Sequence, residues 1–385
     1  MNWKKAKIGD HCEITSSKRI FYSEYVDSGV PFYRSKEIIE SSQGQPISEP
    51  LYISTERYNE IKSKFGVPMP GDMLLTSVGT IGIPYIVRQE DHFYFKDGNL
   101  TWFRNFDGSL LSKFLCYWIG SKEGYGVLNN TTIGSSQKAL TIASLKQIEC
   151  PLPPVEIQER VVDILSGYDN LIENNQKQIK LLEEAAQRLY KEWFVDFHFP
   201  GYEDTPIVDG VPKGWLSGSI GDIAEFKRGK TITKKQAING EIPVVAGGKE
   251  PAYWHNKANT GNPVITVSAS GNAGFTRLYY QKVWASDCSY LDRDATKNLF
   301  YVYLHLKYRQ DDIYSMQKGA CQQHVNAKEI NSMKILIPAN DVLQLFNEIV
   351  SPYFEKISTL ERQIQFAAQA RDRLLPKLMS GEIEV

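Results

Sequence analysis

Long hydrophobic runs are missing from this sequence. No segment approaches the roughly 18 apolar residues that a membrane-spanning helix requires, and the first residues, MNWKKAKIGDHCEITS, lack the apolar core of a signal peptide. We therefore expect a cytoplasmic protein without membrane contact. With 385 residues and 42% hydrophobic content, the chain is long enough for two domains that each bury a core.

Cysteine and histidine are scarce and scattered. The five cysteines, at positions 12, 116, 150, 288 and 321, are odd in number and widely dispersed, which fits neither a disulfide framework nor paired metal ligands. The six histidines include no HExxH pair. We interpret the cysteines as reduced thiols and expect no metal site.

A strong charge of either sign is also missing, because 44 basic residues face 45 acidic ones. A protein that binds nucleic acid is often basic overall. The distribution is nevertheless uneven, since the loop-like segment EFKRGKTITKK (225–235) carries five lysines and arginines. A basic patch on a neutral chain therefore remains compatible with the sequence.

The sequence repeats itself. GSSQKALT at Gly134 returns as GACQQHVN at Gly319, and the offset of 185 persists to Leu189 and Leu374. Earlier in each half, IGD at Ile8 returns at Ile220 with an offset of 212, so the first half contains extra loop residues. The chain is predicted to be a tandem duplication of one unit, a variable globular region followed by a helix.

The globular regions favour a mixed α+β fold. Runs such as GDMLLTSVGTIGIPYIV and NPVITVSASGNAGFTRLYY are typical of short strands joined by glycine turns, whereas LLSKFLCYWIG and LFYVYLHLKY have helical character. Each region ends in prolines, ECPLPP at 149–154 and LIPAND at 336–341, after which the pattern becomes helical. The predicted fold is two such regions separated by two long helices.

A 4-3 apolar spacing marks both long helices, as packing along a coiled coil requires. The residues predicted to pair the helices are Tyr168, Ile172, Asn175, Ile179, Leu182, Leu189, Tyr353, Ile357, Leu360, Ile364, Ala367 and Leu374. Each stripe could instead dock on its own domain. Because two matched stripes are each too long for a small domain to cover, we expect an antiparallel coiled coil with pseudo-twofold symmetry.

Local signals predict interruptions in these helices. Ser166 with Asp169 resembles a capping box, and Ser351 before Pro352 resembles an N-cap followed by proline at the first helical position. These signals predict a short helix before each long one. Pro376 is expected to end or kink the second helix.

At this point the sequence resembles the specificity (S) subunits of type I restriction-modification systems. The resemblance rests on PLPPVEIQERVVDIL and LIENNQKQIKLLEEAAQRLYKEWFVDF in the middle, LERQIQFAAQARDRLLPKLMSGEIEV at the end, and GDIAEFKRGKTITKK. It implies a first target recognition domain at 1–152, a central conserved helical region at 153–198, a second target recognition domain at 199–338 and a C-terminal conserved helical region at 339–385. The two helical regions would be the spacer.

The resemblance also implies a role in DNA recognition without catalysis. Each recognition domain would read one half of a bipartite site in double-stranded DNA. The paired helices would set the spacer and dock two modification (methyltransferase) subunits. Restriction (translocase and endonuclease) subunits would join this complex. No cofactor is expected on this chain, while S-adenosylmethionine, ATP and Mg²⁺ would lie on the partner subunits. The helix from Tyr168 to Trp193 would span roughly 38 Å, close to one turn of B-DNA.

DNA binding requires cations for phosphates and planar polar groups for base edges. The candidate phosphate contacts are Lys18, Arg19, Lys227, Arg228, Lys230, Thr231, Lys234 and Lys235, together with Ser77, Thr80, Ser270 and Asn272 in the glycine loops TSVGTIG and SASGNAG. The candidate base readers are Arg34, Gln137, Lys138, Gln322, Gln323 and His324. Ordinary solvated charges and tight strand turns explain many of these residues equally well.

Two other classes of function compete with DNA recognition. An enzyme acting alone is disfavoured, because the sequence has no GxxxxGKS/T phosphate loop, no GxSxG elbow and only GNPV in place of an Asn-Pro-Pro-aromatic motif. A two-domain coiled-coil scaffold that binds protein rather than DNA remains an alternative, since the net charge is close to zero. No catalytic residues are predicted.

Overall fold

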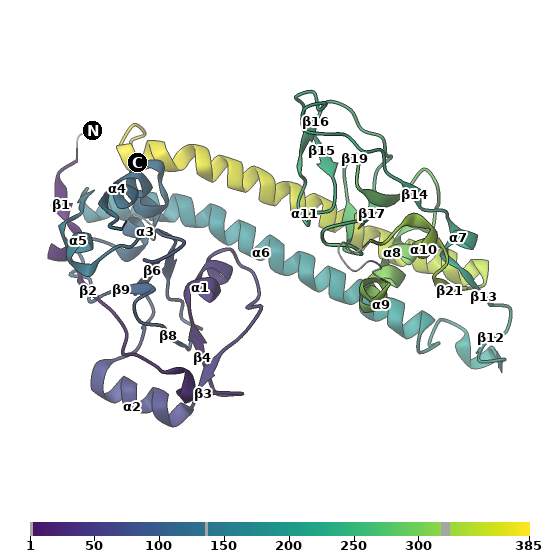
Figure 1. The fold of residues 1–385 in the computed structure, drawn as a ribbon, viewed down its shortest axis with the longest axis horizontal. Helices are drawn as coiled ribbons and strands as arrows, with labels where there is room; N and C mark the ends of the chain where they lie inside the picture. Colours follow the sequence, from purple (N-terminus) through teal and green to yellow (C-terminus); the bar gives the residue numbers. More distant parts are fainter. Residues whose placement is uncertain (1–2, 135–137, 317–323) are drawn as a thin grey trace. The chain divides into compact units, whose positions relative to one another are not determined.

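The computed structural model describes residues 3–134, 138–316 and 324–385 (Figure 1). The chain divides into two compact units. Unit 1 comprises residues 1–174 and 363–385, and unit 2 comprises residues 175–362. Each unit therefore contains one globular region together with half of each long helix.

The globular region of unit 1 contains two four-stranded sheets. The first has the order β2-β9-β6-β7 and the second β3-β5-β4-β8. All neighbours pair antiparallel except β4 and β8, which are parallel. The strands are β2 (Glu13–Thr15), β3 (Tyr25–Val26), β4 (Val30–Tyr33), β5 (Tyr52–Ile53), β6 (Met73–Thr76), β7 (Pro84–Ile86), β8 (Tyr94–Phe95) and β9 (Leu100–Arg104).

Helices and a small ribbon surround these sheets. The ribbon pairs β1 (Lys5–Lys7) with β10 (Glu149–Pro151). The helices are α1 (Ser35–Ser42), α2 (Thr55–Phe65), α3 (Ser112–Gly120), α4 (Lys122–Thr131) and α5 (Ile142–Gln147), with single 3-10 turns at η1 (Ile8–Asp10) and η2 (Tyr22–Glu24). Central strands β6 and β9 are almost wholly buried, which explains their continuous apolar runs.

Unit 2 repeats this plan. One sheet has the order β14-β20-β17-β18, another has the order β16-β15-β19, and β13 pairs with β21. The strands are β13 (Leu216–Ser219), β14 (Lys227–Arg228), β15 (Ile242–Val245), β16 (Tyr253–His255), β17 (Val264–Ser268), β18 (Thr276–Tyr279), β19 (Trp284–Ala285), β20 (Cys288–Asp292) and β21 (Lys334–Ile337). A separate hairpin pairs β11 (Ile207–Val208) with β12 (Val211–Pro212) after the turn η3 (Tyr202–Asp204).

The short helices of unit 2 are α7 (Ile220–Ile223), α8 (Leu299–Tyr308), α9 (Gln310–Ser315) and α10 (Ala327–Asn331). Helix α8 is buried along almost its whole length because it crosses the domain core. The parallel pair β15 and β19 corresponds to β4 and β8, and the sheet β14-β20-β17-β18 corresponds to β2-β9-β6-β7. The predicted α+β fold and internal repeat are therefore confirmed.

Two long helices, α6 (Val155–Phe194) and α11 (Asn340–Ser380), contribute to both units. In unit 2 the ring of Phe346 on α11 lies 6.4 Å from Tyr190 and 5.6 Å from Trp193 on α6. In unit 1, Val161 and Leu165 share one core with Leu378 and Met379. Since early residues of one helix meet late residues of the other, the helices pair antiparallel in each unit (Figure 1).

The predicted interruptions are wrong, because α6 continues through Ser166 and α11 through Ser351 and Pro352. The Ser351 hydroxyl donates to the carbonyl of Asn347 at 2.6 Å inside the helix. Pro352 is exposed, and the neighbouring Val350 and Phe354 are buried in the core. Their burial outweighs the cost of about 3 kcal/mol that an interior proline imposes.

The predicted end at Pro376 is also wrong, since α11 extends to Ser380. Pro376 is exposed, whereas Leu378 and Met379 beyond it are buried in the core of unit 1. The apolar residues past the proline therefore hold the last turn in helical form.

Candidate nucleic-acid interface

The basic segment of unit 2 lies on an edge strand. Lys227 and Arg228 form β14, which pairs with β20, and both side chains are exposed. The backbone behind them is fixed by hydrogen bonds from Gly229 N to Cys288 O at 2.8 Å and from Lys230 N to Ala285 O at 2.9 Å. A hydrogen-bonded backbone thus presents exposed cations to solvent.

Gly229 allows this close approach to the neighbouring chain. A Cβ at that position would lie 2.5 Å from the carbonyl oxygen of Ser286 and 2.7 Å from that of Ala285. The residues that follow, Thr231, Lys234 and Lys235, are exposed as well. The six polar or cationic side chains predicted within 227–235 therefore lie on the surface, where a phosphate can reach them.

A groove of about 720 Å³ adjoins this segment. Lys227 and Arg228 line it together with Lys328 and Asn331 from α10, and Asp222 and Glu225 also border it. Sequence reasoning missed both residues. Lys328 is exposed, whereas the side-chain amide of Asn331 is hydrogen-bonded to the backbone of Phe226. The only local signal was the NAKE capping box, whose Asn326 accepts from Lys328 N at 3.0 Å.

In unit 1 the corresponding cations are Lys18 and Arg19, which are exposed just after β2. Lys18 N donates to the Tyr94 hydroxyl at 2.6 Å, and the Lys18 ammonium lies 4.5 Å from the centre of the Phe65 ring. Arg19 Nε donates to Asp97 at 2.8 Å. Arg19 is therefore partly neutralised, whereas Lys18 has no such carboxylate partner among the contacts of the described residues.

The glycine loops behave differently from the prediction. Ser77 is only 2% exposed and its hydroxyl lies 2.6 Å from Thr101 Oγ1. Ser270 donates to the carboxylate of Asp287. Neither hydroxyl is free for a phosphate, because one is buried and the other lies against a negative charge. Thr80 and Asn272 are exposed, so their predicted role is compatible with their positions.

Arg34 does not present a free guanidinium. It precedes α1, where its Nη2 lies 2.5 Å from Glu37 Oε1 and its backbone N donates to Glu37 Oε2 at 2.7 Å. Hydrogen bonding to Glu37 raises the pKa of Arg34. The predicted base reader is thus part of a helix cap around a fully buried carboxylate. The Glu three residues after Arg34 was the sequence signal for this cap.

The remaining predicted base readers are only partly described. Lys138 is exposed and donates to Asn129 Oδ1 at 3.0 Å, and His324 is exposed. Gln137, Gln322 and Gln323 lie outside the described residues. These positions all belong to the repeated sequence segments GSSQKALT and GACQQHVN.

None of the twelve residues predicted to pair the helices is fully exposed. Asn175, Ile357, Leu360 and Ala367 are buried, and half-buried positions are Tyr168, Ile172, Ile179, Leu182, Leu189, Tyr353, Ile364 and Leu374. Part of each stripe also packs on its own globular core: Ile179, Leu182 and Ile357 join the core of unit 2, and Leu374 that of unit 1. Docking on a domain and helix pairing therefore occur together.

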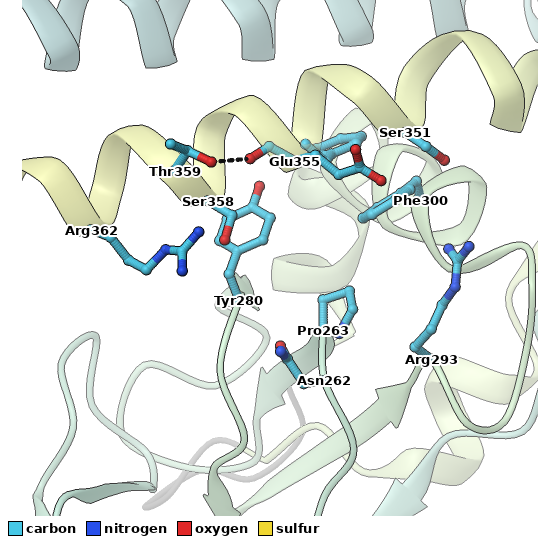
Figure 2. Close-up of a pocket in the computed structure, with 11 residues that line it drawn as sticks. Asn262, Pro263, Tyr280, Arg293, Phe300, Ser351, Glu355, Ser358, Thr359 and Arg362 are labelled. Atoms are coloured by element: carbon cyan, nitrogen blue, oxygen red, sulfur yellow. Dashed lines mark hydrogen bonds between the residues drawn. The ribbon is translucent and has the colours of Figure 1, made fainter.

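A second cavity, of about 360 Å³, lies between α11 and the sheet region of unit 2 (Figure 2). Arg362 and Glu355 on the helix face Tyr280 and Arg293 across it. Burial raises the pKa of Tyr280 strongly, so its hydroxyl stays protonated. Polar and charged groups, among them Ser351 and Ser358, line the cavity and suit polar binding.

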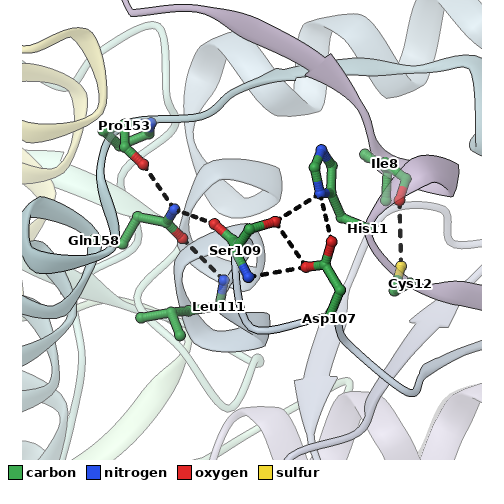
Figure 3. Close-up of polar contacts among 8 residues, drawn as sticks. All are labelled: Ile8, His11, Cys12, Asp107, Ser109, Leu111, Pro153 and Gln158. Carbon is green, nitrogen blue, oxygen red and sulfur yellow. Dashed lines mark hydrogen bonds and ion pairs between the residues drawn. The ribbon is translucent and has the colours of Figure 1, made fainter.

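One constellation in unit 1 has the composition of a catalytic triad (Figure 3). His11 Nδ1 lies 2.8 Å from Ser109 Oγ and 3.0 Å from Asp107 Oδ2. In a triad the serine and the carboxylate contact different imidazole nitrogens, whereas here both contact Nδ1. Burial opposes ionisation of Asp107, but hydrogen bonds from Ser109 and His11 lower its pKa to about 2.

This constellation instead anchors a helix. Gln158 on α6 is fully buried, and its Oε1 accepts from Leu111 N at 2.9 Å at the start of α3. Its Nε2 donates to Ser109 O at 2.8 Å and Pro153 O at 2.9 Å. All the amide's polar atoms are engaged within the protein, so the network fixes α6 against the globular region (Figure 3).

The cysteines described by the structure are unreactive thiols. Cys12, Cys116, Cys150 and Cys288 are free, and burial raises the pKa of each to about 12. Within residues 3–134, 138–316 and 324–385, no three histidine, cysteine or acidic side chains converge as metal ligands. No helix in the described part of the chain is long and apolar enough to cross a membrane.

Comparison with known proteins identifies relatives over the whole chain. The profile of the family "Type I restriction modification DNA specificity domain" matches residues 1–184 and 212–367. The MjaIX specificity subunit of a type I restriction enzyme from Methanocaldococcus jannaschii is 28% identical over 422 aligned positions, covering 100% of this chain and 94% of the relative. A putative type I specificity subunit from Haemophilus influenzae is 30% identical across 49% of this chain and 46% of its own length.

A similar fold is known experimentally. The crystal structure of a type I restriction-modification S subunit from M. genitalium matches with a TM-score of 0.64 and 16% identity. The match covers 98% of this chain and 96% of that one. The two family matches correspond to the two halves of the internal repeat.

Proposed function

This chain belongs to the family of type I restriction-modification DNA specificity subunits, and on that premise we propose that it reads a bipartite site in double-stranded DNA. Each globular region recognises one half of the site. The paired helices set the unspecified spacer between the halves. The observation that supports this proposal is the repetition of one fold in which an exposed basic segment follows the first strand of the same sheet in each unit.

Partners supply the chemistry in this proposal. Two modification subunits dock on the helical regions and bring S-adenosylmethionine for adenine methylation, and restriction subunits add ATP- and Mg²⁺-dependent translocation and cleavage. The chain itself contributes recognition and no catalytic group. The misplaced Ser109, His11 and Asp107 geometry is consistent with that assignment.

Salt dependence of binding tests the DNA-binding part of the proposal. Affinity for duplex DNA should fall steeply with added salt, because each neutralised phosphate releases counterions. The charge-reversal variant K227E/R228E/K230E should lose DNA binding while it still assembles with the modification subunit. A matched control reverses exposed Lys177 and Lys180 on α6, and DNA binding should then persist.

The alternative, a protein-binding scaffold, predicts the reverse pattern. Its affinity for partners would respond weakly to salt, and duplex DNA would not bind to the wild-type chain. Unchanged DNA affinity in the K227E/R228E/K230E variant would remove this segment from the interface.

A further inference from the structure

Two adjacent aromatic side chains in unit 1 are exposed to solvent. Tyr22 is 87% exposed and Phe21 is 61% exposed. Large apolar rings are rarely left so exposed side by side unless a partner covers them. The two rings belong to the segment SKRIFYSEY, which begins two residues after strand β2 ends.

The local structure holds these rings in place. Phe21 N donates to Glu24 Oε2 at 2.7 Å across the turn η2, and Glu24 pairs with Arg57 of α2 at 2.8 Å. The Tyr22 ring meets the edge of Tyr25 at 5.5 Å, and Tyr25 packs on the fully buried Phe32. The backbone of Phe21 and the ring of Tyr22 are thus held in place, which lowers the entropic cost of binding through them.

Two cations lie close to the rings in the sequence. Lys18 and Arg19 precede Phe21 with one residue between, and Lys18 lies over the ring of Phe65, which is itself 46% exposed. Aromatic faces next to cations match the two chemistries of nucleic acid, since bases stack on rings and phosphates attract ammonium and guanidinium groups. In the duplex of the proposed function, the rings can stack only on a base that leaves the helical stack.

Unit 2 has different side chains at the corresponding place. With the offset of 212 that aligns Ile8 with Ile220, Lys18 corresponds to Lys230, Phe21 to Thr233 and Tyr22 to Lys234. Strand β14 also precedes this segment as β2 precedes the other, at the same edge position of its sheet. Thr233 and Lys234 are exposed. One copy thus presents two rings where the other presents a hydroxyl and a cation.

We propose that Phe21 and Tyr22 stack on bases of the half-site bound by unit 1, whereas Lys234 and Lys235 contact backbone phosphates of the half-site bound by unit 2. This inference rests on the proposed DNA-binding function and specifies how the two halves differ. Stacking does not release counterions, while phosphate contacts do. The two contacts should therefore differ in their dependence on salt.

The test compares two double variants of the full-length chain, F21L/Y22L and K234Q/K235Q. The probe is a fluorescein-labelled mixed-sequence duplex, titrated over a series of salt concentrations. F21L/Y22L should weaken binding about tenfold or more with an unchanged salt slope. K234Q/K235Q should lower the slope by about 0.9 for each phosphate that the variant no longer neutralises. Both variants change exposed side chains, so thermal unfolding should match that of the wild-type chain.

Permanganate oxidation of thymines gives a second measurement. Bases that leave the stack become reactive, so wild-type protein should produce reactive thymines that disappear with F21L/Y22L and persist with K234Q/K235Q. Wild-type affinity in F21L/Y22L would overturn the proposal, as would an equal change of salt slope in both variants. Loss of assembly with the modification subunit in F21L/Y22L, with DNA binding intact, would assign the rings to a protein partner and also overturn it.

Failure of the proposed function gives a different result. In that case the wild-type chain itself would not bind the duplex, and no variant comparison would arise. Binding by the wild-type chain with no effect of F21L/Y22L rejects only the stacking contact.

Discussion

Arg371 Nη1 lies 2.7 Å from Asp169 Oδ1, although 202 residues separate them in the chain. The other oxygen of Asp169 accepts from the Tyr117 hydroxyl at 2.6 Å. One carboxylate on α6 thereby contacts α11 and α3 within unit 1. Arg371 on α11 therefore has a carboxylate partner on α6.

Disruption of the Asp169–Arg371 ion pair should lower the unfolding free energy by a small but measurable amount. We expect a double-mutant cycle of Asp169→Asn and Arg371→Gln to give a coupling free energy of about 0.5–1 kcal/mol, because both side chains are partly exposed. Urea unfolding of the full chain, followed by tryptophan fluorescence, measures it. The cycle of Arg371→Gln with Asp372→Asn is the control, since Asp372 lies on the same helix. Equal coupling in the two cycles would contradict a role in joining the helices.

Substitution of the buried Gln158 should destabilise the protein far more than disruption of the Asp169–Arg371 pair. Gln158→Leu would leave Leu111 N and the carbonyls of Ser109 and Pro153 without partners, and we expect a loss of about 2–4 kcal/mol in unfolding free energy. Exposed Glu159 on the same helix supplies the control, and Glu159→Leu should change stability by less than about 0.5 kcal/mol. Similar effects of the two substitutions would show that the network does not anchor α6.

Acid should destabilise unit 2 through His305. Burial lowers the pKa of His305 to about 4, and its Nδ1 lies 2.8 Å from the Tyr190 hydroxyl. As pH falls from 6.5 towards 4, His305 becomes protonated in the unfolded chain but stays neutral in the folded chain. The unfolding free energy therefore decreases by up to about 3 kcal/mol. Between pH 6.5 and 4, the unfolding free energy should depend less on pH in His305→Phe than in the wild-type chain. A variant of exposed His198 should keep the wild-type dependence. An unchanged slope in His305→Phe would refute this assignment.

A rise in pH towards neutrality should also destabilise unit 2, through Glu361. Burial raises its pKa to about 7, Arg277 opposes the rise and Glu183 adds to it. The contribution of Glu361 is complete below pH 4.5 and is lost as pH rises towards 7. Glu361→Gln should therefore raise the unfolding free energy at pH 8 by about 1–3 kcal/mol and leave it unchanged at pH 4. Exposed Glu355 provides the control, and a destabilised Glu361→Gln at pH 8 would contradict the sign.

Periodic features of this fold could be predicted from the sequence. The 4-3 spacing identified both long helices because burial of one face recurs along the chain, and the matched offsets identified the repeat. Local signals at Ser166 and Pro352 predicted breaks that do not occur. Their effects are small compared with the burial of Val350 and Phe354, which depends on residues that are distant in sequence.

The candidate interface, too, could be predicted from the sequence only in part. Exposure of Lys227 and Lys230 could be predicted because charged side chains in a short basic segment are rarely buried. Ser77 could not be assigned correctly, since its partner Thr101 lies on another strand. Exposure of Phe21 and Tyr22 depends on which rings the core has room for, and that is a property of the packed domain.

The most direct test of the proposed function is a map of methylated adenines in host DNA, with and without this chain, in the presence of its modification subunit. The proposal predicts a split motif that appears only with the chain, with its halves centred about one helical turn apart. A continuous motif, or methylation at the same sites without the chain, would contradict it.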